Sequence, residues 1–169
     1  SAIACASRTV PEAMIPVNLE MAIDPLRPDA IFLDLPALTK AEVLKTLAAR
    51  AVEIAGGDPV VIARALNDRE KLGSTGVGAG VALPHAAIDD LTEPVALFAR
   101  LARPIDWEAI DDQPVDLVAV VLSPHRGAGS SLNLLAKFAR WLRDSVTRDT
   151  LRACTDVDQV RRSIAGPSG

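Results

Sequence analysis

The sequence has 169 residues, of which 49% are hydrophobic and 24% are charged. This length and composition fit one globular domain and exclude a disordered chain. The formal net charge is −4, aromatic residues make up only 3%, and tyrosine is absent. Nucleic acid is bound by clustered basic residues and aromatic stacking, so we expect no nucleic-acid partner. The apolar runs fall far short of the ~20 residues that span a bilayer, so no membrane insertion is expected either.

The two cysteines, Cys5 and Cys154, lie near opposite ends of the chain. One disulfide between them stays open, but their number indicates no disulfide framework, and a reducing, cytoplasmic setting is expected. Two histidines and two distant cysteines are too few for a usual zinc site, so we expect no metal. Residues 1–16 are expected to be a flexible arm or a cloning remnant. One short helical turn is expected after them, near residues 19–23. Residues 166–169 are expected to form a frayed tail.

The predicted elements begin with a short strand over residues 31–35. Thr39 and Glu42 form a capping box, which predicts a helix with one apolar face. The glycine pair at 56–57 ends this helix. An Asp-Pro pair then begins a second helix over residues 59–71, with the acid as N-cap.

Three strands are expected next, over residues 81–85 (ended by a proline), 94–102 and 114–124. The third is almost entirely apolar and rich in valine, so it should be central and covered on both faces. An amphipathic helix over 132–144 follows. Two shorter helices are expected at residues 148–153 and 157–164. The order β-α-α-β-β-β-α-α-α predicts an α/β fold with a mixed sheet and helices on both faces.

A glycine-rich segment leads to a histidine. In an extended chain Gly76, Gly78 and Gly80 would share one face, and a face without side chains lets a ligand approach closely. Pro84 favours an extended residue before it, so His85 should emerge where the strand ends, a common place for reactive groups. A glycine-rich turn with a surface histidine stays open as the alternative. A dinucleotide fingerprint is excluded, because a helix precedes these glycines and a strand follows them.

Two further features could bind an anion. Arg69, just before the glycines, carries a planar guanidinium that suits a phosphoryl group or a carboxylate. Taken alone, however, an arginine near the end of an exposed helix and next to an acid is usually just solvated. The loop over residues 123–131 contains a histidine and an arginine and precedes a helix, whose N-terminus favours negative charge. Alternatively, Ser130 or Ser131 simply caps this helix.

Residues 69–85 read REKLGSTGVGAGVALPH. This segment resembles the phosphorylation-site region of type-2 EIIA domains, the fructose/mannitol class of the bacterial phosphotransferase system, which includes nitrogen-regulatory members. Residues 103–107, RPIDW, resemble the P-I-D-(F/W) segment of that family. The following stretches, 111–115 and 132–142, resemble its D-x-x-P-V segment and its helix after the active-site loop. The resemblance covers residues 17–165 and implies a three-layer α/β/α sandwich around a small mixed sheet.

The resemblance also implies a function. Members of this family are phosphotransferase components that take a phosphoryl group from phospho-HPr, or from its nitrogen-branch paralogue. They pass it to an EIIB domain, or use it as a regulatory signal toward a target protein. By position, His85 is the phosphorylated nucleophile and Arg69 stabilises the phosphoryl charge; no cofactor is implied. The residues expected to bind around this site are Ser74, Thr75, Gly76, Gly78 and Gly80.

The sequence departs from the family's pattern at three positions. Ser131, in SLNLL, stands where the family usually has a second histidine, and His125 is a candidate substitute. Ala79 replaces the Asn or Glu of many members, and Ala86 follows the histidine in place of glycine. A regulatory binding module that keeps the fold without transferring phosphate stays open, as does an unrelated small-molecule-binding domain. The sequence holds no EIIB or EIIC segment, which favours the nitrogen-regulatory branch, although a fragment of a longer protein would look the same.

Overall fold

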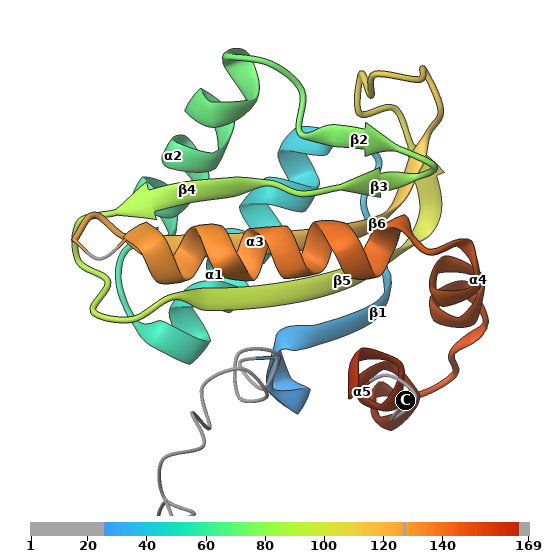
Figure 1. Ribbon diagram of the computed structural model, residues 1–169. Helices are drawn as coiled ribbons and strands as arrows, with labels where there is room; N and C mark the ends of the chain where they lie inside the picture. Colours follow the sequence, from blue (N-terminus) through green and yellow to red (C-terminus); the bar gives the residue numbers. More distant parts are fainter. Residues whose placement is uncertain (1–25, 127, 166–169) are drawn as a thin grey trace, which may run out of the picture.

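The computed structural model describes residues 26–126 and 128–165 (Figure 1). The expected arm at 1–16, the helical turn at 19–23 and the tail at 166–169 lie outside the described residues. Cys5 lies outside them as well, so the structure does not test the disulfide. Among the described residues Cys154 has no disulfide partner and is buried, and burial raises the pKa of its thiol.

A mixed sheet forms the centre of the described chain. Its six strands are β1 (Ile31–Leu35), β2 (Gly76–Gly78), β3 (Val81–Ala82), β4 (His85–Ile88), β5 (Val95–Ile105) and β6 (Val115–Pro124). The spatial order is β1-β5-β6-β3-β2, and β4 also pairs with β6. Strands β3 and β4 therefore follow one another along the same side of β6, both parallel to it, whereas β5 lies antiparallel on the other side.

Helices cover both faces of the sheet (Figure 1). The short 3-10 helix η2 (Pro28–Ala30) precedes β1. The α-helices are α1 (Lys40–Ala55), α2 (Pro59–Lys71), α3 (Ala128–Arg143), α4 (Ser145–Ala153) and α5 (Val157–Ala165). The expected α/β fold with a mixed sheet between helices is confirmed. None of the helices in the described ranges has the length and apolar character needed to cross a membrane.

Two hydrophobic cores lie on opposite sides of the sheet, and strand β6 contributes to both. Val118, Val120 and Leu122 face the core that packs against α1 and α2. The residues between them face the core of α3, α4 and α5, as Val121 does. Since successive side chains of a strand point to opposite faces, a strand buried on both faces must be apolar throughout. This confirms the prediction of a central, doubly covered strand.

The predicted helix ends are also confirmed. The Thr39 hydroxyl accepts a hydrogen bond from the backbone N–H of Glu42 at 3.2 Å. The Glu42 carboxylate reaches back to the N–H of Leu38, one residue before the position of an ideal capping box. Gly56 ends α1 with a φ of 77°, and Asp58 caps α2 by accepting from the N–H of Val60 at 2.8 Å.

The glycine-rich segment differs from its prediction. It forms a hairpin of β2 and β3, so the expectation that Gly76, Gly78 and Gly80 share one extended face is wrong. Gly78 and Gly80 have φ values of 103° and 79°, which break the alternation of an extended strand. The predicted single strand over 81–85 is interrupted at Pro84, and a new strand, β4, begins at His85. The sheet therefore has two more short strands, β2 and β4, than expected.

Helix α3 begins earlier than predicted. Its first residue is Ala128, so Ser130 and Ser131 lie within its first turns. The alternative that one of them is the N-cap is wrong, because an N-cap residue precedes the helical backbone.

Candidate functional site

His85 begins strand β4, where its Cα is in parallel register with that of Val121. Its half-buried ring makes two contacts: Nδ1 lies 2.9 Å from the carbonyl oxygen of Leu83, and Nε2 lies 3.3 Å from Nε of Arg69. A carbonyl oxygen can only accept, so we assign the proton to Nδ1. In this tautomer the lone pair of the neutral imidazole is on Nε2 and points at the guanidinium.

Arg69 lies in the last turn of α2. Besides its contact with His85, its Nη1 donates to the carbonyl oxygen of Gly73 at 2.9 Å. Within the described residues, no carboxylate forms an ion pair with this guanidinium. Its positive charge therefore lies beside the ring nitrogen that carries the lone pair, an arrangement that suits an anionic ligand.

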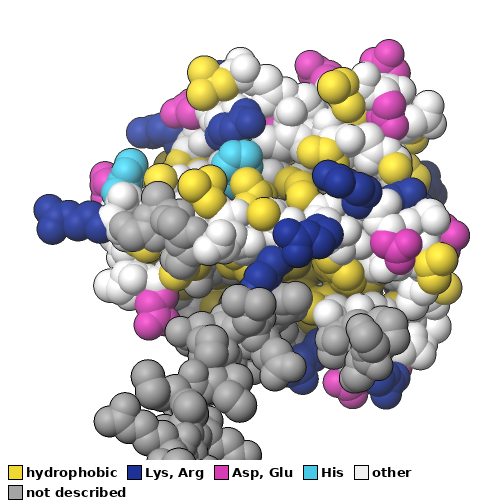
Figure 2. Space-filling model, viewed as in Figure 1, with side chains coloured by type: hydrophobic (Ala, Val, Ile, Leu, Met, Phe, Trp, Pro, Cys, Tyr) yellow, Lys and Arg dark blue, Asp and Glu magenta, His cyan; other side chains and the backbone are white. Residues whose placement is uncertain are grey.

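The surface around this pair is apolar with basic side chains. Figure 2 looks onto the face covered by α3 and shows a histidine next to a basic side chain, with hydrophobic side chains close by. Two large apolar residues near the site in the chain are exposed: Leu72, which follows α2, is 85% exposed, and Val77 of β2 is 55% exposed. An exposed apolar group beside a charged site is typical of a surface that contacts another protein.

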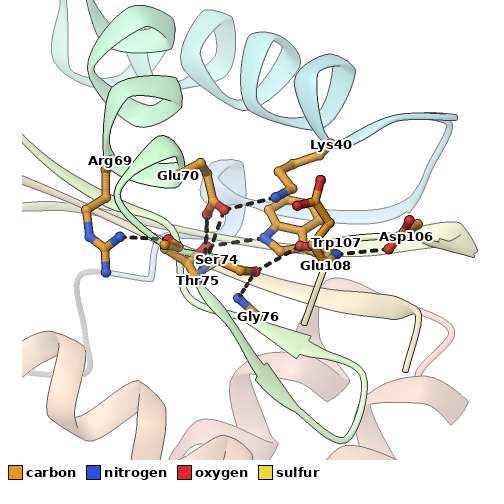
Figure 3. Close-up of polar contacts among 10 residues, drawn as sticks. Lys40, Arg69, Glu70, Ser74, Thr75, Gly76, Asp106, Trp107 and Glu108 are labelled. Atoms are coloured by element: carbon orange, nitrogen blue, oxygen red, sulfur yellow. Dashed lines mark hydrogen bonds and ion pairs between the residues drawn. The ribbon is translucent and has the colours of Figure 1, made fainter. Parts of the chain in front are cut away.

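The next residue on α2, Glu70, holds the loop that follows. Its carboxylate accepts from the backbone N–H of Thr75 at 3.2 and 3.3 Å and from the Thr75 hydroxyl (Figure 3). It also forms an ion pair with Lys40, the first residue of α1, at 3.2 Å. The Glu70 side chain is only 6% exposed, so a charged group is buried here with three donors around it.

Trp107 completes this cluster from the segment between β5 and β6. The indole is fully buried, and its Nε1 donates to the Thr75 hydroxyl at 3.2 Å. Its carbonyl oxygen accepts from the Ser74 hydroxyl at 2.8 Å, and that hydroxyl accepts from the N–H of Gly76 at 3.1 Å (Figure 3). The hydroxyls of Ser74 and Thr75 are thus engaged inside the loop, where they hold its shape.

The three glycines have different neighbours. A Cβ on Gly76 would lie 2.7 Å from the Cβ of Ala109, so this position packs against the 106–110 segment. Gly78 and Gly80 flank the β2–β3 turn, which points away from β4 (Figure 1). The structure therefore brings Gly76 into the loop beside the site, and it places Gly78 and Gly80 at the far end of the hairpin.

The β2–β3 turn is fastened from both sides. Ala79, with a φ of 55°, donates its N–H to Asp111 at 2.8 Å and accepts at its carbonyl from Nη2 of Arg152 at 2.8 Å. Hydrogen bonds from the backbone N–H groups of Ala79 and Gln113 lower the pKa of Asp111. Two bonds between Arg152 and Asp116, at 2.8 and 2.9 Å, raise the pKa of the guanidinium.

Ser131 and His125 occupy different surroundings. Ser131 is 6% exposed, and its hydroxyl is the one buried side-chain polar atom of the described residues that has no hydrogen-bond partner. His125 is 58% exposed at its side chain, with Nε2 3.1 Å from a carboxylate oxygen of Asp89. In the described part of the chain neither residue hydrogen-bonds to His85, so the structure does not bring the candidate substitute to the imidazole.

Reasoning from the sequence missed the cluster of Lys40, Glu70 and Trp107. The signals were present, since an acid directly follows Arg69 and the tryptophan lies in the RPIDW segment.

The described residues contain no group of three or more histidine, cysteine, aspartate and glutamate side chains that could hold a metal ion.

The fold and this site define a class that comparison with known proteins identifies. A sequence profile of the "Phosphoenolpyruvate-dependent sugar phosphotransferase system, EIIA 2" family matches residues 24–166, and the chain belongs to this family. Its relatives include nitrogen regulatory proteins, as the expected branch implies. One of them, from Bradyrhizobium diazoefficiens, is 42% identical over 144 residues, which cover 85% of this chain and 94% of that protein.

Solved structures agree. The crystal structure of the nitrogen regulatory protein IIA-Ntr from Neisseria meningitidis matches with a TM-score of 0.81 at 27% identity, covering 85% of this chain and 99% of the other. Enzyme IIA-mannitol from Escherichia coli, solved in complex with phosphorylated enzyme IIB-mannitol, matches with a TM-score of 0.72, covering 84% of this chain and 98% of the other. At 23% identity, this second match shows the shared fold.

Proposed function

We propose that this chain is a phosphocarrier of the nitrogen-regulatory branch, in which His85 accepts a phosphoryl group on Nε2. The observation that carries the proposal is the pair of contacts on the imidazole. Nδ1 is committed to the Leu83 carbonyl, and Nε2 lies 3.3 Å from a guanidinium that no carboxylate of the described residues pairs with. In the Nδ1–H tautomer the ring lone pair is thus on Nε2, the nitrogen that has a cation beside it.

The transfer is an exchange between two imidazoles. The Nε2 lone pair of His85 attacks the phosphorus of a phosphohistidine donor, one N–P bond forms as the donor's N–P bond breaks, and the broken bond's electron pair returns to the donor nitrogen. In the loose transition state charge spreads over the phosphoryl oxygens, so stabilisation by fixed donors is the protein's main task. Arg69 supplies it by turning its N–H groups from Nε2 to these oxygens, while Gly73 keeps the side chain in place.

The donor and the acceptor are proposed to be proteins. The donor is phospho-HPr or its nitrogen-branch paralogue. The acceptor is an EIIB domain or a regulatory target that reads the phosphorylated state. Exposed Leu72 and Val77 supply apolar contacts for such partners. The complex of enzyme IIA-mannitol with phosphorylated enzyme IIB-mannitol supports the EIIB class of acceptor, and the nitrogen regulatory relatives support the regulatory one.

The test is phosphorylation by a purified donor. The chain is incubated with phospho-HPr and, separately, with the phosphorylated nitrogen-branch paralogue, and its intact mass is measured. We expect one added phosphoryl group that is acid-labile and is lost in His85→Ala. His125→Ala is the matched control, because the other histidine is exposed and should leave the label unchanged. A folded wild type that takes no label from either donor would refute the phosphocarrier and favour a regulatory binding module that keeps the fold.

A further inference from the structure

Glu70 is a buried carboxylate with no part in the proposed transfer. It follows Arg69 directly, but neighbouring residues of a helix do not face each other, and the two side chains leave α2 in different directions (Figure 3). Burying a charged group costs free energy unless it is paired and hydrogen-bonded. At 6% exposure Glu70 meets both conditions through Lys40 and Thr75. An apolar residue could fill this position in an ordinary core, but here the buried carboxylate is both paired with Lys40 and hydrogen-bonded to Thr75.

The loop that Glu70 holds contacts Arg69 directly and reaches His85 through Leu83. The carbonyl oxygen of Gly73 accepts from Arg69 at 2.9 Å. The carbonyl oxygen of Thr75 accepts from the N–H of Leu83 at 3.0 Å, and the carbonyl of Leu83 in turn accepts from Nδ1 of His85. A continuous chain of hydrogen bonds thus runs from the Glu70 carboxylate, through the backbone of Thr75 and Leu83, to the imidazole.

We infer that Glu70 is a positioning residue, which fixes the 73–75 loop and through it the tautomer of His85 and the place of Arg69. This inference rests on the proposed phosphocarrier function. The hydroxyl of Thr75 ties the carboxylate to the indole of Trp107, which is fully buried. Removing the charge of Glu70 loosens the loop at Thr75. The carbonyl of Gly73, which meets Arg69, and that of Thr75, which meets Leu83, then lose their fixed directions.

Lys40 has a second role in this arrangement. A carboxylate next to Arg69 in the sequence could neutralise the guanidinium that the phosphoryl group needs. Lys40 instead pairs with Glu70 at 3.2 Å and lies over the Trp107 ring at 5.7 Å from its centroid. The negative charge of Glu70 is therefore compensated on the side of α1, and the charge of Arg69 stays available.

The experiment compares Glu70→Gln with matched variants by two readouts. The first is the 15N NMR spectrum of the His85 ring in the unphosphorylated protein, which reports the nitrogen that carries the proton. The second is the rate of phosphorylation by phospho-HPr. Thr75→Val removes the hydroxyl, and Thr75→Ser is the matched variant that keeps it. Glu53→Gln is the control, because it also removes one carboxylate from a helix but only from an exposed ion pair with Arg50.

In the wild type and in Glu53→Gln we expect the Nδ1–H tautomer to dominate. In Glu70→Gln we expect a mixture of tautomers and a rate lower by roughly tenfold, since small misplacements of reacting groups have effects of this size or larger. Thr75→Val should show the same loss and Thr75→Ser should recover. Folded Glu70→Gln and Thr75→Val with the wild-type tautomer and rate would overturn the inference. If Glu70→Gln does not fold, the Thr75 pair decides in the same way.

The NMR readout separates this inference from the proposed function. If the wild type takes no phosphoryl group but the tautomer still depends on Glu70 and on the Thr75 hydroxyl, the phosphocarrier proposal fails and the positioning of the imidazole stands. If the wild type is phosphorylated and the tautomer and rate are indifferent to Glu70, only the positioning fails.

Discussion

Two arginines hold the two ends of the glycine-rich segment in similar ways but with different charge environments. Arg69 donates to the carbonyl of Gly73 at 2.9 Å, and Arg152 donates to the carbonyl of Ala79 at 2.8 Å. Arg152 also makes two bonds to the carboxylate of Asp116, whereas Arg69 also contacts Nε2 of the His85 ring. Arg152 therefore fastens a turn with its charge neutralised by Asp116. Arg69 fastens a loop in a similar way, but its charge remains available to an anion.

The largest effect that separates the two arginines should be on phosphoryl transfer. Arg69→Ala removes the cation beside Nε2, so we expect phosphorylation by phospho-HPr to slow by roughly 100-fold, the effect of losing one charge-stabilising donor. Its free energy of unfolding should change little. Arg152→Ala should leave the rate unchanged and lower the free energy of unfolding by about 1 kcal/mol, because partly exposed ion pairs contribute little. Rate measurements and urea unfolding of both variants check this, and equal rates would contradict the assigned role of Arg69.

The glycines sharpen the same comparison through stability. A Cβ on Gly76 would lie 2.7 Å from the Cβ and 2.9 Å from the Cα of Ala109, and this backbone cannot easily move. Gly76→Ala should therefore lower the free energy of unfolding by about 3 kcal/mol, as overpacking does. A Cβ on Gly80 would meet the guanidinium of Arg152 and, at 2.8 Å, a carboxylate oxygen of Asp116. Both are ends of side chains that can shift, so we expect a loss of about 1–2 kcal/mol, mainly from the positive φ. Urea unfolding measures both, and a larger loss for Gly80→Ala would show that the turn, not the loop, is the rigid end.

Local signals explain which parts of the fold could be predicted from the sequence. The caps at Thr39 and Asp58 depend on residues within three positions, and both form as expected. The end of the strand at Pro84 is predicted by the proline itself. The new strand that begins at His85 could not be foreseen, because it forms by pairing with β6, far along the chain, where the N–H of Val121 also donates to the carbonyl of Pro84. The early start of α3 likewise has no local cap in the sequence that would mark it.

The candidate site also has a part that the sequence predicts and a part that depends on contacts between distant residues. His85 and Arg69 were singled out by resemblance to a family, since spacing alone left a surface histidine and a solvated arginine as open alternatives. The cluster that supports them joins Thr75 to Trp107, 32 residues apart, and Lys40 to Glu70, 30 residues apart. Contacts at such separations depend on the register of β5, β6 and the two helices, which no pattern within one segment encodes.

Ser131 provides a smaller test on the α3 side of the sheet. Its hydroxyl is buried with no hydrogen-bond partner among the residues that the structure describes, which is unfavourable compared with an apolar group of the same size. We expect Ser131→Ala to raise the free energy of unfolding by about 1 kcal/mol, measured by urea unfolding. Ser145→Ala, at an exposed serine in α4, is the control. A loss of stability in Ser131→Ala would mean that the hydroxyl is satisfied in solution.

The smallest expected effect concerns the exposed fastening of the β2–β3 turn and depends on pH. Hydrogen bonds from Ala79 and Gln113 lower the pKa of Asp111 below its ordinary value of 3.8, so the folded state favours the charged carboxylate. The stabilisation is fully present above pH 3.8 and is lost as the pH falls through the lower folded value. The difference in unfolding free energy between the wild type and Asp111→Asn should therefore stay constant above that pH and shrink below it. If the difference in unfolding free energy between the wild type and Asp111→Asn persisted well below pH 3.8, the turn would depend on the shape of Asp111 rather than on its charge.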